Sequence, residues 1–182
     1  MSGAWEELRS AGREQLALRG AIVVAGLVFA VAAAATGGAD LWADPWFAVA
    51  IPALALLAAL SPHTFLPAVL MLYLVGVWIT GTPELWTPWA PLAAACLLVI
   101  HTAAAIATSV PAQATLPARL WRLYLPRVAV LLGAAVAVWA VVGLVHGRTV
   151  PGGPAAMVTG LAVVTAGLLA HQRAVIRRTR QD

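Results

Sequence analysis

His101 is the side chain best placed for chemistry, because it is the one ionisable group near the middle of a long apolar stretch. On a helix it shares a face with Leu97, Ala104 and Thr108, and that face is mildly polar and rich in small residues. Such a face suits close helix packing, with the imidazole hydrogen-bonded to a neighbouring helix. We therefore predict an interhelical polar contact at His101 and Thr108, and the alternative is that they bind a ligand or carry a proton.

The sequence shows no other arrangement typical of catalysis or metal binding. It contains no GxSxG motif, no HExxH motif and no phosphate-binding glycine loop. The single cysteine, Cys96, excludes a CxxC motif, and His63 and His171 have no carboxylate or thiolate beside them. No Asp or Glu lies within an apolar stretch, which argues against ion-coupled transport. We expect no enzyme activity, no cofactor and no metal; an enzyme would need His101 for turnover.

The composition is that of an integral membrane protein. Hydrophobic residues make up 62% of the chain and charged residues 10%, whereas soluble domains are roughly 45–50% apolar and about 25% charged. Every basic residue is an arginine, which together with abundant alanine and glycine indicates a bacterial protein of the plasma membrane. The arginines flank apolar stretches, so they predict contacts with the anionic head groups of the lipid bilayer and not with nucleic acid.

The apolar stretches predict an all-α fold, a bundle of six transmembrane helices. Start signals recur at Asp44-Pro45, Ser61-Pro62 and Thr87-Pro88, where a capping side chain precedes a proline. The predicted spans are 20–36, 45–60, 62–80, 88–109, 126–146 and 154–172. They form one membrane domain over 20–172, preceded by an interfacial segment at 1–19 and followed by an arginine-rich cytoplasmic tail at 173–182.

Two parts of this predicted membrane topology have alternatives. One helix over 45–80 would be about 54 Å long, which is too long for a hydrocarbon core of ~30 Å. We therefore expect two helices with a break at Ser61-Pro62, and a re-entrant hairpin is the other possibility. The first span, 20–36, would be an uncleaved helix or the apolar part of a cleaved signal peptide.

The distribution of arginine predicts that both termini are cytoplasmic. With six spans, all but one of the arginines fall on the inner side, and only Arg148 is external. Removing one span from the count would place a whole arginine cluster on the outer side of the membrane. Each arginine held at mid-membrane would cost roughly 2.5–3.5 kcal/mol on insertion scales. The inner residues are Arg9, Arg13, Arg19, Arg119, Arg122, Arg127, Arg173, Arg177, Arg178 and Arg180.

Tryptophan supports the same orientation. Indole rings favour the head-group level of a membrane, and five tryptophans fall at the predicted outer boundary. They are Trp42, Trp46, Trp78, Trp86 and Trp89. Trp5 and Trp121 fall at the inner boundary, and only Trp139 lies deeper in a predicted span.

Two segments outside the spans predict short amphipathic helices in the cytoplasmic interface. They lie near 2–19 and 116–125, and the second separates a leucine stripe from Arg119 and Arg122. These arginines, together with Arg177 and Arg178 in the tail, are predicted contacts for a cytoplasmic partner or for lipid.

We therefore expect a non-catalytic accessory, assembly or scaffolding subunit with a membrane or cytoplasmic protein partner, and a homo-oligomer is possible. The alternative is a solute-binding membrane subunit of a small-molecule transporter. The six spans and the Ala30/Ala34 spacing resemble in outline the substrate-capture subunits of energy-coupling-factor importers. That resemblance implies a ligand near the outer tryptophans Trp86 and Trp89.

Overall fold

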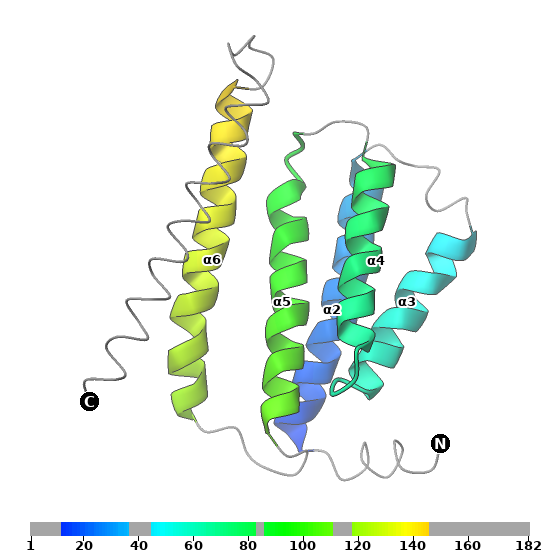
Figure 1. The fold of residues 1–182 in the computed structure, drawn as a ribbon, viewed down its shortest axis with the longest axis vertical. Helices are drawn as coiled ribbons and strands as arrows, with labels where there is room; N and C mark the ends of the chain where they lie inside the picture. The colour runs from blue at the N-terminus through cyan, green and yellow to red at the C-terminus, as the bar shows by residue number, and fades with distance from the viewer. Residues whose placement is uncertain (1–11, 37–44, 83–85, 111–117, 146–182) are drawn as a thin grey trace. The chain divides into compact units, whose positions relative to one another are not determined.

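The computed structural model describes residues 12–36, 45–82, 86–110 and 118–145. Within these ranges all regular structure is helical and no strand occurs. The helices are α2 (Arg13–Ala35), α3 (Pro45–Leu60), α4 (Leu66–Gly81), α5 (Ala90–Ser109) and α6 (Ala118–Val145). Successive helices from α2 to α5 run in opposite directions (Figure 1). The prediction of an all-α fold is confirmed for this part of the chain.

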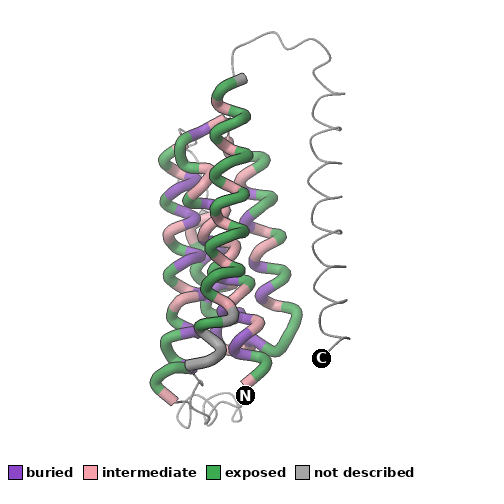
Figure 2. The backbone as a smooth tube through the Cα atoms, turned by 90° about the vertical axis from the view of Figure 1, so that its left-hand side faces the viewer, coloured by how far each residue is buried: buried purple, intermediate pink, exposed green. Residues whose placement is uncertain are grey.

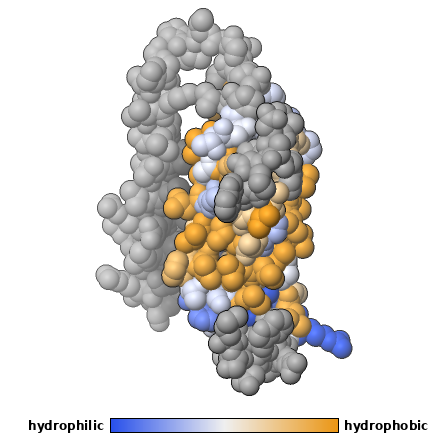
Figure 3. Space-filling view, turned by 90° about the vertical axis from the view of Figure 1, so that its right-hand side faces the viewer, coloured by the Kyte–Doolittle hydropathy of each residue, from blue (hydrophilic) through white to orange (hydrophobic). Residues whose placement is uncertain are grey.

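Three of these helices are long and apolar enough to cross a membrane. They are α2, α5 and the part of α6 from Tyr124 to Leu144, whereas the apolar parts of α3 and α4 are shorter. Hydrophobic residues cover the middle of the face on the α3 side, and hydrophilic residues gather toward its ends (Figure 3). Such a band is what a membrane-associated protein presents to the bilayer.

The connection between α3 and α4 differs in detail from the prediction. α3 covers 45–60 as expected, and a break follows it, but Ser61-Pro62 does not begin the next helix. Residues 61–65 form a turn in which the Thr64 hydroxyl donates to the Ser61 carbonyl (2.7 Å) and accepts from the Leu66 N–H (3.2 Å). The span predicted at 62–80 is therefore the helix Leu66–Gly81, because Thr64 stabilises a turn where we expected a cap.

A similar turn precedes α5, which begins at Ala90 and not at residue 88. The Thr87 hydroxyl accepts from the Trp89 N–H (3.3 Å), and the Thr87 carbonyl accepts from the Ala90 N–H (3.2 Å). In both places a threonine satisfies backbone groups ahead of the helix, so the helix begins two to four residues later than the proline indicates.

α2 and α6 extend through segments that we expected to be separate interfacial helices. α2 is continuous from Arg13, and α6 is continuous from Ala118 through Pro126, where we expected the fifth span to begin. Proline is tolerated inside membrane helices because neighbouring groups satisfy the freed carbonyl. The rest of these two predicted segments, 1–11 and 116–117, lies outside the described residues, as do the predicted span 154–172 and the tail 173–182.

α2 is the central helix of the core and packs against α3, α4 and α5. The largest fully buried side chains come from three helices: Phe29 and Ile22 from α2, Leu70 and Leu74 from α4, and Ile100 from α5. Buried positions recur along one side of each of these helices (Figure 2). α3 contributes mainly small residues, so α2 and α3 approach closely.

Gly26 marks the closest approach of α2 and α3. A Cβ atom added there would lie 3.1 Å from the Cβ of Ala55, which is itself fully buried. Gly20, on the same helix, is exposed and has no atom within 4 Å of the equivalent position. Substitutions at the two glycines therefore distinguish two effects: the need for a small residue at the contact between α2 and α3, and the low helix propensity of glycine itself.

We predict that Gly26→Leu separates α2 from α3 and lowers the free energy of unfolding by roughly 1–3 kcal/mol. Gly20→Leu is the matched control and is expected to leave stability unchanged or raise it by up to about 1 kcal/mol, because leucine is the better helix former. Thermal unfolding of the two variants in the same detergent measures the difference. Equal midpoints for both variants would contradict the packing described for Gly26.

Candidate functional site

Two polar side chains near the start of α2 point into the bundle. Gln15 and Arg19 are one helical turn apart, and each is only 4% exposed. They lie on the side of α2 that continues through the buried residues Ile22 and Phe29. The buried face of α2 is therefore apolar along most of its length and carries two enclosed polar side chains near its N-terminal end.

Gln15 connects α2 to the end of α5. Its Nε2 donates to the carbonyl oxygen of Ala107 at 3.2 Å, in a bond that is buried. Ala107 belongs to the last turn of α5, where carbonyl groups have no partner within their own helix. Gln15 therefore satisfies from another helix a carbonyl that water would otherwise have to reach.

Arg19 makes the same kind of contact with the end of α3. Its Nη1 donates to the carbonyl oxygen of Leu60, the last residue of α3, at 3.4 Å. A cation at a helix C-terminus is favourable, because the carbonyl end of the helix carries a partial negative charge. The Nε of Arg19 is also buried, and it has no hydrogen-bond partner among the described residues.

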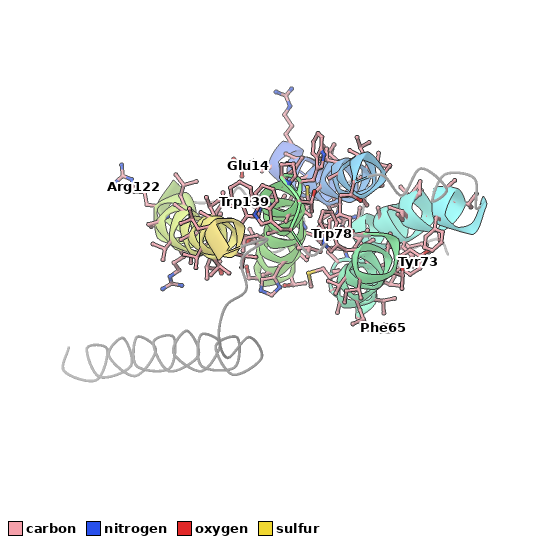
Figure 4. All side chains as sticks on the ribbon, turned by 90° about the horizontal axis from the view of Figure 1, so that it is seen from above. Glu14, Phe65, Tyr73, Trp78, Arg122 and Trp139 are labelled. Carbon is pink, nitrogen blue, oxygen red and sulfur yellow. The ribbon has the colours of Figure 1, made fainter. Side chains whose placement is uncertain are left out.

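The second candidate site is a contact between two tryptophans, which we call the tryptophan clasp (Trp86 and Trp139). Their rings are stacked, with centroids 5.4 Å apart and planes inclined by 15°. Trp139 Nε1 donates to the carbonyl of the buried Thr87 at 2.8 Å, and Trp86 Nε1 donates to the carbonyl of Trp139 at 3.3 Å. Viewed from above, Trp139 lies between α6 and α5 (Figure 4).

Gly143 completes the clasp, because it leaves room for the indole of Trp86. A Cβ added at Gly143 would lie 2.6 Å from Trp86 Nε1 and 2.9 Å from Trp86 Cε2. Gly143 follows Trp139 by one helical turn, so both residues lie on the same face of α6. Tyr124, near the start of α6, packs against the hydrophobic core.

Three of the predicted outer tryptophans are described, and they have different environments. Trp78 is half-buried, with its ring 5.6 Å from that of Phe29 and inclined by 64°. Trp86 belongs to the clasp, and Trp89 is 38% exposed. The side chains of Trp42 and Trp46 lie outside the described residues, so the outer belt remains a prediction.

His101 and Thr108 lie on an exposed side of α5, away from its buried face. The Thr108 hydroxyl donates to the Ala105 carbonyl of its own helix at 2.9 Å. His101 makes no interhelical hydrogen bond within the described residues, and the interhelical contact remains a prediction. Cys96 is buried, and the described ranges contain no group of three or more side chains suited to a metal ion.

The predicted contacts for a partner or lipid are described at one position only. Arg122, in the first turns of α6, is exposed. The side chain of Arg119 lies outside the described residues, and so do Arg177 and Arg178.

Sequence reasoning missed the roles of Gln15, Arg19 and Trp139. Both Gln15 and Arg19 fall within 2–19, the segment that the sequence predicts as an amphipathic helix in the cytoplasmic interface. Extending the buried stripe of α2 backward by one turn at a time would have found both residues. For Trp139, its depth in an apolar helix was the signal, because a buried indole N–H requires an acceptor.

We predict that Gly143→Ala disrupts the tryptophan clasp. The added methyl group displaces the Trp86 indole from its stack and its hydrogen bond, and the expected loss is roughly 1–3 kcal/mol in the free energy of unfolding. Gly133→Ala is the control on the same helix, because Gly133 is exposed and nothing lies within 4 Å of the added atom. Thermal unfolding in detergent compares them, and a Gly133→Ala variant as unstable as Gly143→Ala would argue against the clasp.

No family model, curated protein or solved structure matches this chain. Its function is therefore inferred from the packing, charge and hydrogen bonding of the described residues.

Proposed function

We propose that this chain is a non-catalytic subunit of a membrane assembly, with an accessory, assembly or scaffolding role. The observation that supports this most directly is the surface of α6. Its membrane-length stretch from Tyr124 to Leu144 contains no fully buried residue. A specific contact, the tryptophan clasp, nevertheless holds this helix in place.

The exposed surface of α6 is apolar and has room for another helix. The half-buried residues of α6 follow one face, which includes Val128, Leu132 and Trp139. Elsewhere its large residues, such as Val130 and Val141, are exposed. Gly133 faces open space, and small residues allow helix backbones to approach closely in a membrane. The predicted span 154–172 lies outside the described residues, and we propose that a membrane partner covers the part of this surface that the chain itself leaves open.

The proposed setting is a bacterial plasma membrane, with six spans and both termini in the cytoplasm. The alternation of the described helices supports it, because α2 and α6 begin at the end where α3 and α5 finish. Arg13, Arg19, Arg122 and Arg127 all lie in the first part of α2 or α6. Arginine gathered at one end of a bundle favours a cytoplasmic location for that end.

The alternative of a solute-binding transporter subunit has less support. It requires Trp86 and Trp89 near a ligand, but the ring and the N–H of Trp86 are already engaged by Trp139. An enzyme is also less well supported, because the described residues provide no hydrogen-bond partner to orient His101.

A photo-crosslinking amino acid at two exposed positions tests the proposal in native membranes. We predict that a probe at Val130 of α6, which is 71% exposed, captures a different protein in reproducible yield. A probe at Leu72 of α4, which is 75% exposed, is the matched control and should capture mainly lipid. Mass spectrometry of the adducts identifies what was captured.

Capture of only lipid at Val130, or of the same proteins at both positions, would contradict a dedicated partner surface on α6. Capture of a second copy of this chain at Val130 would show a homo-oligomer instead and would remove the argument for an accessory subunit.

A further inference from the structure

α3 and α4 are the two shortest helices in the described part of the chain. Each has 16 residues, which corresponds to about 24 Å at ~1.5 Å per residue. α5 has 20 residues, or about 30 Å, and the hydrocarbon core of a bilayer is also ~30 Å thick. We call the side of the bundle formed by α3 and α4 the short edge (45–60 and 66–81). It is roughly 6 Å shorter than the core that it would cross.

Polar residues bound the short edge at both ends. In the sequence, Asp44 directly precedes α3 and Glu84 follows shortly after α4. At the other end, the turn between the two helices exposes His63 and Thr64. The apolar length of the short edge is therefore set by the two helices themselves.

Two hydrogen bonds show that α3 stops short at the end of the bundle where α2 begins. The carbonyl of Leu60, the last residue of α3, accepts from Arg19 at 3.4 Å, whereas the carbonyl of Ala107 in α5 accepts from Gln15 at 3.2 Å. Gln15 precedes Arg19 by one helical turn, about 6 Å along α2. α5 therefore continues about one turn further than α3, and α2 and α5 extend beyond α3 and α4 at this end (Figure 1).

The exposed surface of the short edge is apolar between its ends. Every exposed residue from 49 to 57 and from 68 to 79 is apolar, and large aliphatic side chains are among them. They include Val49, Leu56, Leu57, Leu72 and Ile79. Polar side chains often join helices to each other within membranes, and this surface offers none between its ends. It therefore suits lipid acyl chains.

The turn between α3 and α4 needs little water for its backbone. The Ser61 N–H donates to the Leu57 carbonyl at 3.0 Å, and the Thr64 hydroxyl bonds to the Ser61 carbonyl and the Leu66 N–H. Groups that are bonded within the protein can lie close to hydrocarbon at low cost. The turn is therefore compatible with a position about one helical turn deeper than the end of α5.

A short apolar edge can meet a thicker bilayer in few ways. Tilting shortens its projection further, so tilting does not make up the difference. Long basic side chains can reach out to the head groups, but Arg19 at this level is enclosed, and the exposed polar residues of the turn are His63 and Thr64. Two ways remain, which are a thinner bilayer and a protein that covers the edge.

We propose that the short edge contacts the phospholipids of a locally thinned bilayer. The leaflet on the side of Arg13 is drawn in toward the α3–α4 turn, so that its acyl chains cover Leu56 and Leu57 and its head groups reach His63. The apolar surface described above favours lipid over a covering protein. This proposal depends on the membrane location of the chain and not on its accessory role.

Nitroxide labels in vesicles of dimyristoyl or dioleoyl phosphatidylcholine, which differ in thickness, test the proposal. The full chain receives single cysteines at three exposed positions of the short edge: His63→Cys in the turn, Thr80→Cys near the other end of α4, and Leu72→Cys between them. Ser109→Cys, exposed at the end of α5, is the matched control for a long helix. The wild type controls for labelling, because its single cysteine is buried. Collisions with oxygen and with a polar nickel complex measure the depth of each label.

We predict that the labels at positions 63 and 80 both lie at the head-group level in both lipids, as the label at position 109 does. Their summed depth in the hydrocarbon should stay near zero, whereas a bilayer that is not thinned would give roughly 6 Å in the thicker lipid. The label at position 72 should be accessible to oxygen and protected from the nickel complex, because acyl chains surround it.

A summed depth of roughly 6 Å in dioleoyl phosphatidylcholine would overturn the proposal. Protection of the label at position 72 from both reagents would also overturn it, because a protein would then cover the short edge. If a variant does not fold, Phe65→Cys replaces His63→Cys and Ile79→Cys replaces Thr80→Cys, since both residues are more than 70% exposed. None of these results depends on what a probe at Val130 captures, so the two proposals can fail separately.

Discussion

The structure depends on satisfying the backbone groups at helix ends in surroundings with little water. In an apolar medium each unsatisfied carbonyl or N–H is costly, so the ends of helices need partners from within the protein. Here the partners come from other helices. Gln15 of α2 bonds to the last turn of α5, Arg19 of α2 bonds to the last carbonyl of α3, and Trp139 of α6 bonds to the carbonyl of Thr87 just before α5. These bonds fix which helix ends lie together.

The same constraint explains the position of α2 at the centre of the core. A helix that satisfies the ends of two neighbours has to lie between them, and α2 packs against both α3 and α5. Its buried face then needs small residues where a neighbour comes close, as at Gly26 beside Ala55, and large ones where the space is wider, as at Phe29. The polar and the apolar parts of this face therefore favour the same arrangement, in which α2 packs against both α3 and α5.

Much of the fold could be predicted from the sequence, because long apolar stretches without charge determine helices strongly. The extent of α3 and the break after Leu60 followed from length and proline alone. The starts of α4 and α5 did not, because Thr64 and Thr87 bond to nearby backbone and delay the helix. That competition is local and depends on geometry that residue types do not reveal.

The candidate sites were harder to predict for a different reason. Charge and polarity indicate where a chain meets water, and this reasoning placed the segment 2–19, which contains Gln15 and Arg19, in the cytoplasmic interface. Their position along the helix decides otherwise. Both residues lie on the buried face of α2, so they are enclosed in the fold, and each donates a hydrogen bond to a carbonyl of another helix. The exposed His101 shows the converse, since its place near the middle of an apolar helix did not make it buried.

Arg19 and Trp139 also show how differently two buried donors can be satisfied. The indole of Trp139 has a single N–H, and one carbonyl at 2.8 Å meets its full requirement. The guanidinium of Arg19 has five donors and a charge, so one carbonyl at 3.4 Å leaves most of its requirement unmet. If only helix capping were needed at the end of α3, a neutral donor such as that of Gln15 would suffice at lower desolvation cost. The charge of Arg19 agrees instead with its place at the arginine-bearing end of α2, which is the end that we propose is cytoplasmic.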